Sequence, residues 1–382
     1  MIQSQATATM KNLYIGVMSG TSVDAIDIVA VEIFDDSFNF INADSFEFEE
    51  SLRKDILEIS RSNSRLNKSA VKLVDQKLAD TYGKAINEFI SRSKINKSDI
   101  EAVGLHGQTI LHKPNAENPF SLQVGDGQIV SNITGLTVID DFRSADINAG
   151  GQGAPLAPLF HAFFFGQDNE VRVVVNIGGI SNESTFEGRK IISGYDYGPG
   201  NVLLDAWAKY NGIGDYDEDG EWAKTGTVNK KFLSLLLNDE FMFIHPPKST
   251  GTDYFNLDWI FQKIGEFNKK LRPEDIQRTF LELTTGFFVC FRDETLDFRL
   301  NKIAISGGGS KNKFLMSEIA DALLIADDDL LTTADWGLDP QWVEAAGFAY
   351  LACLRVNEIS VNLSKVTGSK GKIMLGNIKR PD

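Results

Sequence analysis

Apolar and β-branched residues alternate with polar ones in three successive stretches near the N-terminus, at residues 13–20, 26–34 and 38–49. Such alternation predicts three β-strands joined by turns. A different period follows between residues 66 and 93, where apolar side chains recur every three or four positions, as on one face of a long amphipathic helix. A further apolar run at 100–106 predicts a strand. The first part of the chain therefore begins β-β-β and continues with a helix and a strand.

The same order of elements returns in the second half of the chain. Strand patterns at residues 171–177, 183–188 and 190–196 precede a helical stretch at 201–210, although the two halves share little sequence. A chain of 382 residues exceeds what one hydrophobic core comfortably supports, so we expect two domains with a cleft between them. The pattern as a whole predicts a duplicated α/β fold.

The boundary between the two domains is expected near Phe142, before a loop rich in glycine and proline. The first domain then covers residues 1–142 and the second covers residues 143–354. We expect the C-terminal segment, residues 355–382, to pack back onto the first domain.

Charge and composition exclude several classes of partner. The 38 basic and 53 acidic residues give a net charge of −15, which disfavours non-specific binding to nucleic acid or to an anionic membrane. The chain has no run of 18 apolar residues, and residues 1–10 lack the features of a signal peptide. Cys290 and Cys353 lie in apolar stretches, which predicts buried thiols and neither a disulfide nor a metal site. We predict a cytoplasmic protein without nucleic-acid or membrane partners.

The turn between the first two predicted strands, SGTSVD, has the composition of an anion-binding loop. Because it joins two strands, and not a strand and a helix, it is neither a Walker P-loop nor a Rossmann fingerprint. Glycine lets the backbone approach a phosphate, hydroxyls and amides donate to it, and a carboxylate holds Mg²⁺ through water. A hairpin without a ligand is the alternative for this loop taken alone. The residues assigned to the nucleotide are Ser19, Gly20, Thr21, Ser22 and Asp24, with Asp24 assigned to Mg²⁺.

Two further glycine-rich loops strengthen the prediction of a nucleotide site. NIGGISN, which contains Gly178 and Gly179, again lies between two predicted strands. SGGGSKN follows a short strand and precedes a helix, so its backbone amides are available to an anion at a helix start. A tight turn without a ligand is the alternative for this last loop. Together the three loops predict an ATP site, to which the third contributes Gly307, Gly308, Gly309 and Asn312.

Eight motifs, taken in order, resemble the anhydro-N-acetylmuramic acid kinases of the actin, sugar kinase and Hsp70 superfamily. They are GVMSGTSVDAID, LHGQT, DFR, GGQGAPL, NIGGISN, GYDYGPGN, PKSTGTDYFN and SGGGSKN, and the resemblance extends over nearly the whole chain from Leu13 onward. It implies two actin-like, ribonuclease H-like domains that clamp ATP between two β-hairpins in a central cleft. It also implies a homodimer.

The resemblance further implies a reaction of cell-wall recycling. An ATP-dependent kinase opens 1,6-anhydro-N-acetylmuramic acid with water and phosphorylates O6, which gives N-acetylmuramic acid 6-phosphate. Such chemistry needs a carboxylate base and a nucleotide bound to Mg²⁺. Asp196 matches the family's catalytic aspartate, which activates the water, and Glu344 matches a glutamate that contacts the sugar near the attacked carbon. A helix-capping role for Asp196 and a solvated helix position for Glu344 are the alternatives.

The expected sugar pocket contains one departure from the family. His106 and Gln108 match a block that lines the pocket, although a core histidine is the alternative for His106; Arg143 and Glu344 complete the predicted substrate contacts. In DFRSAD, however, Ser144 and Ala145 stand where many members of the family carry arginines, one of which binds substrate. Losing a guanidinium removes a contact worth roughly 1.5 to 3 kcal/mol.

This departure keeps two other functions open. A kinase for a neutral anhydrosugar such as levoglucosan retains the chemistry with a different substrate. A nonenzymatic ATP switch, like actin, belongs to the same superfamily, but Asp196 and Glu344 argue against it. The role of Lys248, within PKSTGTDYFN, stays open between contact with a phosphate and the end of a helical lobe.

Overall fold

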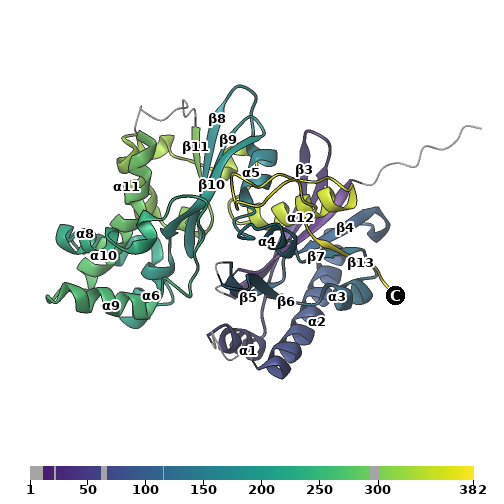
Figure 1. The fold of residues 1–382 in the computed structure, drawn as a ribbon, viewed down its shortest axis with the longest axis horizontal. Helices are drawn as coiled ribbons and strands as arrows, with labels where there is room; N and C mark the ends of the chain where they lie inside the picture. The colour runs from purple at the N-terminus through teal and green to yellow at the C-terminus, as the bar shows by residue number, and fades with distance from the viewer. Residues whose placement is uncertain (1–11, 21–22, 62–66, 115, 293–301) are drawn as a thin grey trace, which may run out of the picture.

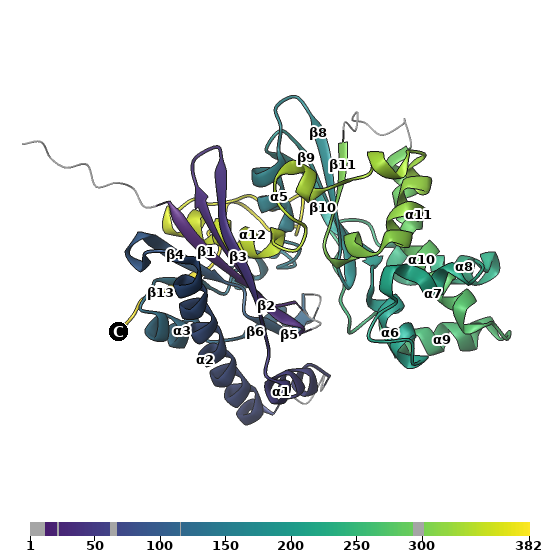
Figure 2. The same ribbon diagram turned by 180° about the vertical axis from the view of Figure 1, so that it is seen from behind.

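The computed structural model describes residues 12–20, 23–61, 67–114, 116–292 and 302–382. Figure 1 shows two groups of strands, with helices α5 and α12 lying between them, and Figure 2 shows the same arrangement from behind. We call the first sheet with its helices the first lobe and the second sheet with its helices the second lobe.

The first sheet has the strand order β13-β7-β4-β1-β2-β3. Strand β2 runs antiparallel to β1 and β3, whereas β1, β4 and β7 are parallel, and β13 pairs antiparallel with β7 at the edge. Its strands are β1 (Leu13–Met18), β2 (Ala25–Ile33), β3 (Phe38–Glu47), β4 (Ile100–Leu105), β7 (Val138–Asp140) and β13 (Asn377–Lys379).

The second sheet has the strand order β10-β9-β8-β11-β12. Strand β9 is antiparallel to both neighbours, whereas β8, β11 and β12 are parallel. Apart from β13, the two sheets therefore share one order and one set of strand directions, which confirms the predicted α/β fold with duplicated actin-like domains. The strands are β8 (Val171–Ile177), β9 (Ile180–Glu187), β10 (Lys190–Pro199), β11 (Lys302–Ser306) and β12 (Leu331–Thr332).

Within the described residues, three hydrophobic cores hold the two sheets and the helices together. One core lies against the outer face of the first sheet and includes α1 and α2, and another joins the second sheet to α6, α8, α9, α10 and α11. The third joins Tyr14 and Val29 of the first sheet, through α5 and α12, to Val174 and Phe186 of the second. The helices are α1 (Glu50–Arg61), α2 (Lys68–Ser93), α3 (Gly127–Thr134), α4 (Ser144–Asn148), α5 (Ala157–Phe165), α6 (Val202–Tyr210), α7 (Glu221–Lys224), α8 (Lys230–Leu237), α9 (Leu257–Phe267), α10 (Pro273–Gly286), α11 (Lys313–Leu323) and α12 (Val343–Val356).

Two glycines let α12 approach the first sheet at backbone distance. A Cβ atom on Gly16 of β1 would lie 1.7 Å from the carbonyl oxygen of Ala345, and one on Gly104 of β4 would lie 2.0 Å from that of Phe348. Glycine inside a strand commonly marks such an approach. The first two turns of α12, which begin with Val343 and Glu344, are therefore fixed against β1 and β4. The division of the chain at residue 142 stays a prediction.

The strands and helices predicted from residue patterns are confirmed, with ends that differ by a few residues. The predicted burial of both cysteines is wrong. Cys353 is half-buried, and Cys290 is exposed because it lies in a 3₁₀ turn that buries its neighbour Phe288. The patterns also missed the hairpin of β5 (Gln108–Lys113) and β6 (Phe120–Val124). None of the described helices is long and apolar enough to cross a membrane.

Candidate active site

The first predicted phosphate loop joins β1 to β2 and is held by side chains of the first lobe. The side-chain amide of Gln108, at the start of β5, donates to the carbonyl of Gly20 at 3.0 Å. The buried hydroxyl of Ser19 lies 2.5 Å from the hydroxyl of Tyr82, in α2. The Ser19 side chain is thus engaged inside the lobe, which leaves the loop backbone for contact with a ligand.

The second part of this loop is anchored by Arg53 of α1. Thr21 and Ser22 lie outside the described residues. Val23 has a φ of +55°, a left-handed conformation that β-branched residues rarely adopt, and such residues concentrate at functional sites. Arg53 donates to the Val23 carbonyl at 3.0 Å and forms an ion pair with Asp24 at 3.2 Å. Asp24 therefore ends the loop as an exposed carboxylate with one cationic partner.

A second carboxyl group, that of Asp205 in α6 of the other lobe, interacts electrostatically with Asp24. Its pKa is raised to about 7 by burial and then by the negative charges of Asp24 and Asp217. The described part of the chain holds no group of three or more His, Cys, Asp or Glu side chains suited to a metal. Two carboxylates are too few to surround Mg²⁺ with protein ligands, but they suit a Mg²⁺ ion that keeps most of its water ligands. Sequence reasoning missed Asp205, although it stands out as the acidic residue in the apolar NVLLDAW.

The second predicted loop supports the start of α6. The carbonyl of Gly178 accepts the N–H of Asn201 at 2.8 Å, and that of Gly179 accepts the N–H of Val202 at 3.1 Å. Both glycines are half-buried at the ends of β8 and β9. The loop and the N-terminus of α6 therefore form one rigid corner of the second lobe.

The third predicted loop packs directly against the second. Gly307 has a φ of +78°, and a Cβ atom there would lie 2.4 Å from the amide oxygen of Asn176. A Cβ atom on Gly309 would lie 2.5 Å from Ile177, at the end of β8. Gly308, between them, is exposed. Only glycine allows this close packing, and it leaves the backbone of Gly308 facing solvent.

The predicted nucleotide residue Asn312 has a structural contact of its own. Its side-chain oxygen accepts the N–H of Leu315 at 3.0 Å and so caps α11. This cap places the N-terminus of α11 directly after the third glycine loop.

Asp196 lies in β10, opposite Asn182 of β9, and is 7 % exposed. Its backbone N–H donates to the carbonyl of Lys248 at 3.1 Å, and its carboxylate accepts the N–H of Thr250 at 2.8 Å. Burial raises its pKa to about 7, against the opposing effects of the Thr250 amide, Arg143 and Lys248. A carboxyl group with a pKa near neutrality suits a general base. Asp196 does not cap α6, because Asn201 occupies that position.

Arg143 joins the predicted catalytic and substrate residues across the two lobes. Its guanidinium donates to the carbonyl of Gly153 at 2.8 Å and lies 2.9 Å from Nε2 of His106. Burial lowers the pKa of Arg143, and the charges of Glu344 and Asp196 raise it. Burial and then Arg143 hold the pKa of His106 well below its usual value, so the imidazole is neutral and accepts through Nε2. These four side chains form one electrostatic cluster.

Glu344 lies half-buried in the first turn of α12. Burial raises the pKa of its carboxyl group, Arg143 lowers it and the charge of Asp27 in β2 raises it. Glu344 is therefore not a solvated residue on an outer helix face. The charges of two carboxyl groups, Asp196 in strand β10 and Glu344 in helix α12, both raise the pKa of the buried Arg143, so one cation serves two acidic groups of the site.

Several buried polar atoms near this cluster have no partner in the described structure. They are Nδ1 of His106, Oε1 of Gln108, Nε of Arg143, Oγ of Ser181, Oδ1 of Asn182 and Oγ of Ser249. Buried polar atoms are nearly always hydrogen-bonded, so a group of unpartnered ones indicates a place for a ligand. Ser181, Asn182 and Ser249 were not predicted, although they lie within NIGGISN and PKSTGTDYFN.

The two positions at which the sequence departs from the family lie in α4. The hydroxyl of Ser144 donates to the carboxylate of Asp141 at 2.6 Å, and Ala145 packs against the core between the lobes. Both side chains are therefore engaged within the protein. Neither supplies a cation to the cluster around Arg143.

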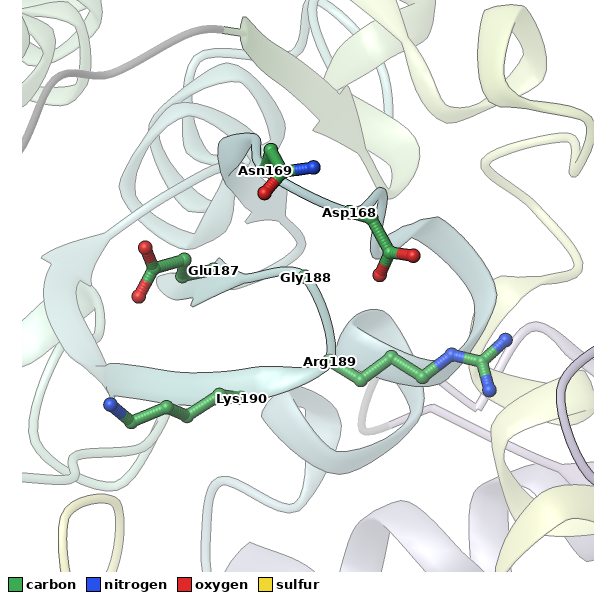
Figure 3. A pocket seen from close by; sticks show the side chains of 6 residues that line it. All are labelled: Asp168, Asn169, Glu187, Gly188, Arg189 and Lys190. Atoms are coloured by element: carbon green, nitrogen blue, oxygen red, sulfur yellow. The ribbon is translucent and has the colours of Figure 1, made fainter.

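A separate hollow lies at the far end of the β9–β10 hairpin (Figure 3). It is lined by Asp168, Asn169, Glu187, Gly188, Arg189 and Lys190. The side chain of Arg189 extends out of the hollow and donates to the carbonyl of Asp35, in the β2–β3 turn of the first lobe, at 3.4 Å. The hollow lies at the turn between β9 and β10. The second glycine loop and Asp196 lie toward the other end of this hairpin, so the hollow is separate from the site around Arg143.

Comparisons with known proteins decide the family. A family model described as anhydro-N-acetylmuramic acid kinase matches residues 12–381. The chain belongs to the anhydro-N-acetylmuramic acid kinase family. The kinase of that name from Haemophilus influenzae is 41% identical over 375 residues, covering 96% of this chain and 97% of the relative. The one from Sulfurimonas denitrificans is 39% identical over 376 residues, covering 97% and 100%.

Solved structures give a weaker similarity. A glucokinase of the ROK family from Streptomyces griseus, in complex with glucose and AMPPNP, covers 89% of this chain and 98% of its own. Its TM-score is 0.37 and its sequence identity 14%, and no functional conclusion rests on it. The family match by itself confirms the resemblance that the eight motifs indicate.

Proposed function

We propose that this member of the family is an ATP-dependent kinase that adds water to 1,6-anhydro-N-acetylmuramic acid and phosphorylates O6. The observation that carries the proposal is that the charges of Asp196 and Glu344 both act on the buried guanidinium of Arg143, which lies 2.9 Å from Nε2 of His106, in a chain whose family is established. The product is N-acetylmuramic acid 6-phosphate, formed in peptidoglycan recycling. The amino-sugar kinase activity follows from the family.

Asp196 acts as the base in the proposed mechanism. Its carboxylate takes a proton from the water whose oxygen attacks the anomeric carbon, and the bond from that carbon to O6 breaks. The N–H of Thr250 and the cation of Arg143 fix the carboxylate during the attack. Glu344 orients the sugar near the attacked carbon, while His106 and Gln108 contact its hydroxyls through their unpartnered atoms.

The three glycine loops are proposed to bind ATP, with the γ-phosphate directed toward the freed O6. Bound ATP supplies the phosphoryl group, and Mg²⁺ neutralises charge on the phosphates. We propose that Asp24 and Asp205 hold the hydrated ion, one from each lobe, because the charge of Asp24 raises the pKa of Asp205 and a bound cation would relieve this repulsion. Gly307 and Gly309 let the third loop pack closely against the end of β8, and we propose that the backbone of Gly178, Gly179 and Gly308 beside them contacts phosphate.

A neutral anhydrosugar is the second candidate substrate. The engaged hydroxyl of Ser144 and the methyl group of Ala145 supply no cation, whereas the acidic muramic sugar carries a carboxylate. A pocket with fewer cations favours an uncharged sugar such as levoglucosan. This alternative changes the substrate and leaves the reaction unchanged.

The test measures ADP release from Mg-ATP with 1,6-anhydro-N-acetylmuramic acid, with levoglucosan or with no sugar, and identifies the product by mass. We expect N-acetylmuramic acid 6-phosphate from the first sugar and little ADP without sugar. Turnover with levoglucosan alone would move the substrate to neutral anhydrosugars. Equal ADP release without sugar would contradict kinase function and favour an ATP switch.

A cytoplasmic homodimer is proposed on the basis of the family resemblance. Light scattering of the purified protein at several concentrations tests the dimer. A mass near that of the 42.2 kDa chain at all concentrations would contradict it.

A further inference from the structure

Lys248 is a buried cation whose role the motif PKSTGTDYFN left open. It lies in the loop between the 3₁₀ turn Glu240–Phe243 and α9, and it is 7 % exposed. Its ammonium group lies 4.5 Å from the centre of the Phe241 ring and donates to the Phe241 carbonyl at 3.4 Å. No carboxylate of the described residues lies within ion-pair distance of it. The ammonium is therefore buried without a direct counter-ion.

A second buried lysine in the same lobe shows how a buried ammonium is usually compensated, by nearby carboxylates. Lys263 of α9 is 8 % exposed and forms ion pairs with Asp239 at 3.2 Å and Glu266 at 3.4 Å. Burying a charge costs free energy unless a partner compensates it. The aromatic face of Phe241 compensates Lys248 only in part. The burial of the Lys248 charge is therefore not explained by protein stability, which indicates a functional role.

The backbone around Lys248 holds Asp196 from two sides. The carbonyl of Lys248 accepts the N–H of Asp196 at 3.1 Å, and the N–H of Thr250, two residues later, donates to the Asp196 carboxylate at 2.8 Å. The loop therefore fixes both the main chain and the side chain of Asp196. The Lys248 ammonium lies beyond ion-pair distance of the same carboxylate and acts on it through its charge.

We propose that Lys248 is a positioning residue for the proposed base, whose buried ammonium keeps the Asp196 carboxylate ionised. This inference rests on the proposed role of Asp196. It gives PKSTGTDYFN a function: the backbone of the motif orients the carboxylate, and its lysine stabilises the negative charge. Without such a cation, burial favours the neutral acid, which cannot accept a proton from water.

The charges facing these groups support the assignment. The Asp196 carboxyl group is faced by the cations Arg143 and Lys248, and both lower its pKa. Arg143 is shared, because Glu344 and Asp146 act on it as well. Lys248 has Asp196 as the one charged group that shifts its own pKa upward, against the effect of burial. Among the described residues, the charge of Asp196 therefore acts on the Lys248 ammonium, whereas the charges of three carboxylates act on the Arg143 guanidinium.

The experiment measures kcat/KM against pH for the wild-type protein, Lys248→Met and Lys248→Arg. Because Asp196 works as the ionised base, kcat/KM falls on the acid side of its pKa. We expect Lys248→Met to move this acid limb upward by about one pH unit, since a neighbouring opposite charge commonly changes a carboxyl pKa by about one to three units. Lys248→Arg should restore most of the wild-type profile.

Two controls separate this role from a structural one. Lys263→Met also removes a buried ammonium, and we expect it to lower the thermal midpoint without moving the acid limb. Asp196→Asn, measured in parallel, tests the base itself. A ¹³C NMR titration of the carboxyl groups, with the Asp196 signal assigned by its loss in Asp196→Asn, reports the carboxyl pKa in folded Lys248→Met without any need for activity.

The outcomes are distinguishable. An upward shift of both the Asp196 titration and the acid limb in Lys248→Met supports the inference. If the Asp196 carboxyl titrates at the same pH in folded Lys248→Met as in wild type, the inference about Lys248 is overturned. If Asp196→Asn is inactive in the same experiment, the proposed role of Asp196 still stands. Near-wild-type turnover of Asp196→Asn would overturn the proposed base and this inference together.

Discussion

At the scale of single residues, Asp196 carries the strongest prediction. We expect Asp196→Asn to lower kcat by roughly 10² or more, because a positioned base commonly contributes about 10²- to 10⁴-fold. The amide keeps the shape of the side chain and its acceptor for the Thr250 N–H. Steady-state kinetics with the anhydrosugar, together with a thermal midpoint that shows a folded variant, checks this. Turnover within a few-fold of wild type would contradict the assignment.

The raised pKa of Asp196 also makes stability depend on pH. Its folded-state pKa of about 7 lies above the ordinary value of 3.8, so the folded protein binds the proton more tightly than the unfolded chain does. The stabilisation from this group is complete below about pH 3.8 and is lost as the pH rises through about 7. Asp205 acts in the same direction. We therefore expect the unfolding free energy, measured by urea denaturation, to fall between pH 5 and pH 8 in the wild-type protein and to fall less in Asp196→Asn. An equal loss in both proteins would contradict the raised pKa.

At the scale of elements, the contact between α12 and the first sheet links packing to the site. The ideal Cβ position of Gly104 lies 2.0 Å from the Phe348 carbonyl, so Gly104→Ala forces the helix and the strand apart. We expect a loss of about 1 to 3 kcal/mol or more in unfolding free energy, since overpacking costs this much. A reduced kcat should accompany it, because Glu344 lies one turn away and displacement of about 1 Å is costly to catalysis.

A matched control exists in α9. Gly265 is exposed and has no atom within 4 Å of its Cβ position. Gly265→Ala should keep kcat and leave stability equal or higher by about 0.5 to 1 kcal/mol, because alanine favours the helix. Denaturation curves and kinetics of both variants decide the point. Equal stability of the two variants would contradict the close approach of α12.

At the scale of the whole molecule, an ion pair connects the two lobes beside the site. Lys113 at the end of β5 lies 2.6 Å from Asp253, in the loop that also contains Lys248 and Thr250. Both side chains are 37% exposed, so the pair contributes about 1 kcal/mol at most and salt weakens it.

Loss of this pair should weaken binding rather than folding. We expect Lys113→Ala to raise KM for the sugar by roughly 1.5- to 5-fold at low salt, with little change in the thermal midpoint, and the difference should shrink in 1 M salt. Lys54→Ala, which breaks an ion pair within α1, is the control and should leave KM unchanged. A KM for Lys113→Ala equal to wild type at low salt would contradict a role for the pair in holding the lobes.

Local patterns were sufficient to predict the three strands that open each half, β4, β11 and the helices α2 and α6, because side-chain alternation and helical periodicity depend on neighbouring residues. The three glycine loops were predicted for the same reason, and the motifs indicated Asp196, Glu344 and Arg143 through the family resemblance. Local patterns did not predict α1, α9 and α10 or the short strands β7, β12 and β13. The short hairpin of β5 and β6 was missed, and so was the exposure of Cys290. In both cases a few residues decide the outcome, and packing with distant elements outweighs the local pattern.

The sequence by itself determined the duplicated order of strands and helices, the glycine loops and the family. Only the tertiary structure decided which charges act on one another: Arg143 with Asp196 and Glu344, Asp24 with Asp205, and Lys248 with Asp196. These pairs join residues about 50 to 200 positions apart, and periodicity carries no information over such separations. The pKa of each group follows from burial and from neighbours that the fold brings together. The chemistry of the site is therefore a property of the packed lobes, whereas the elements that build them can be predicted from the chain.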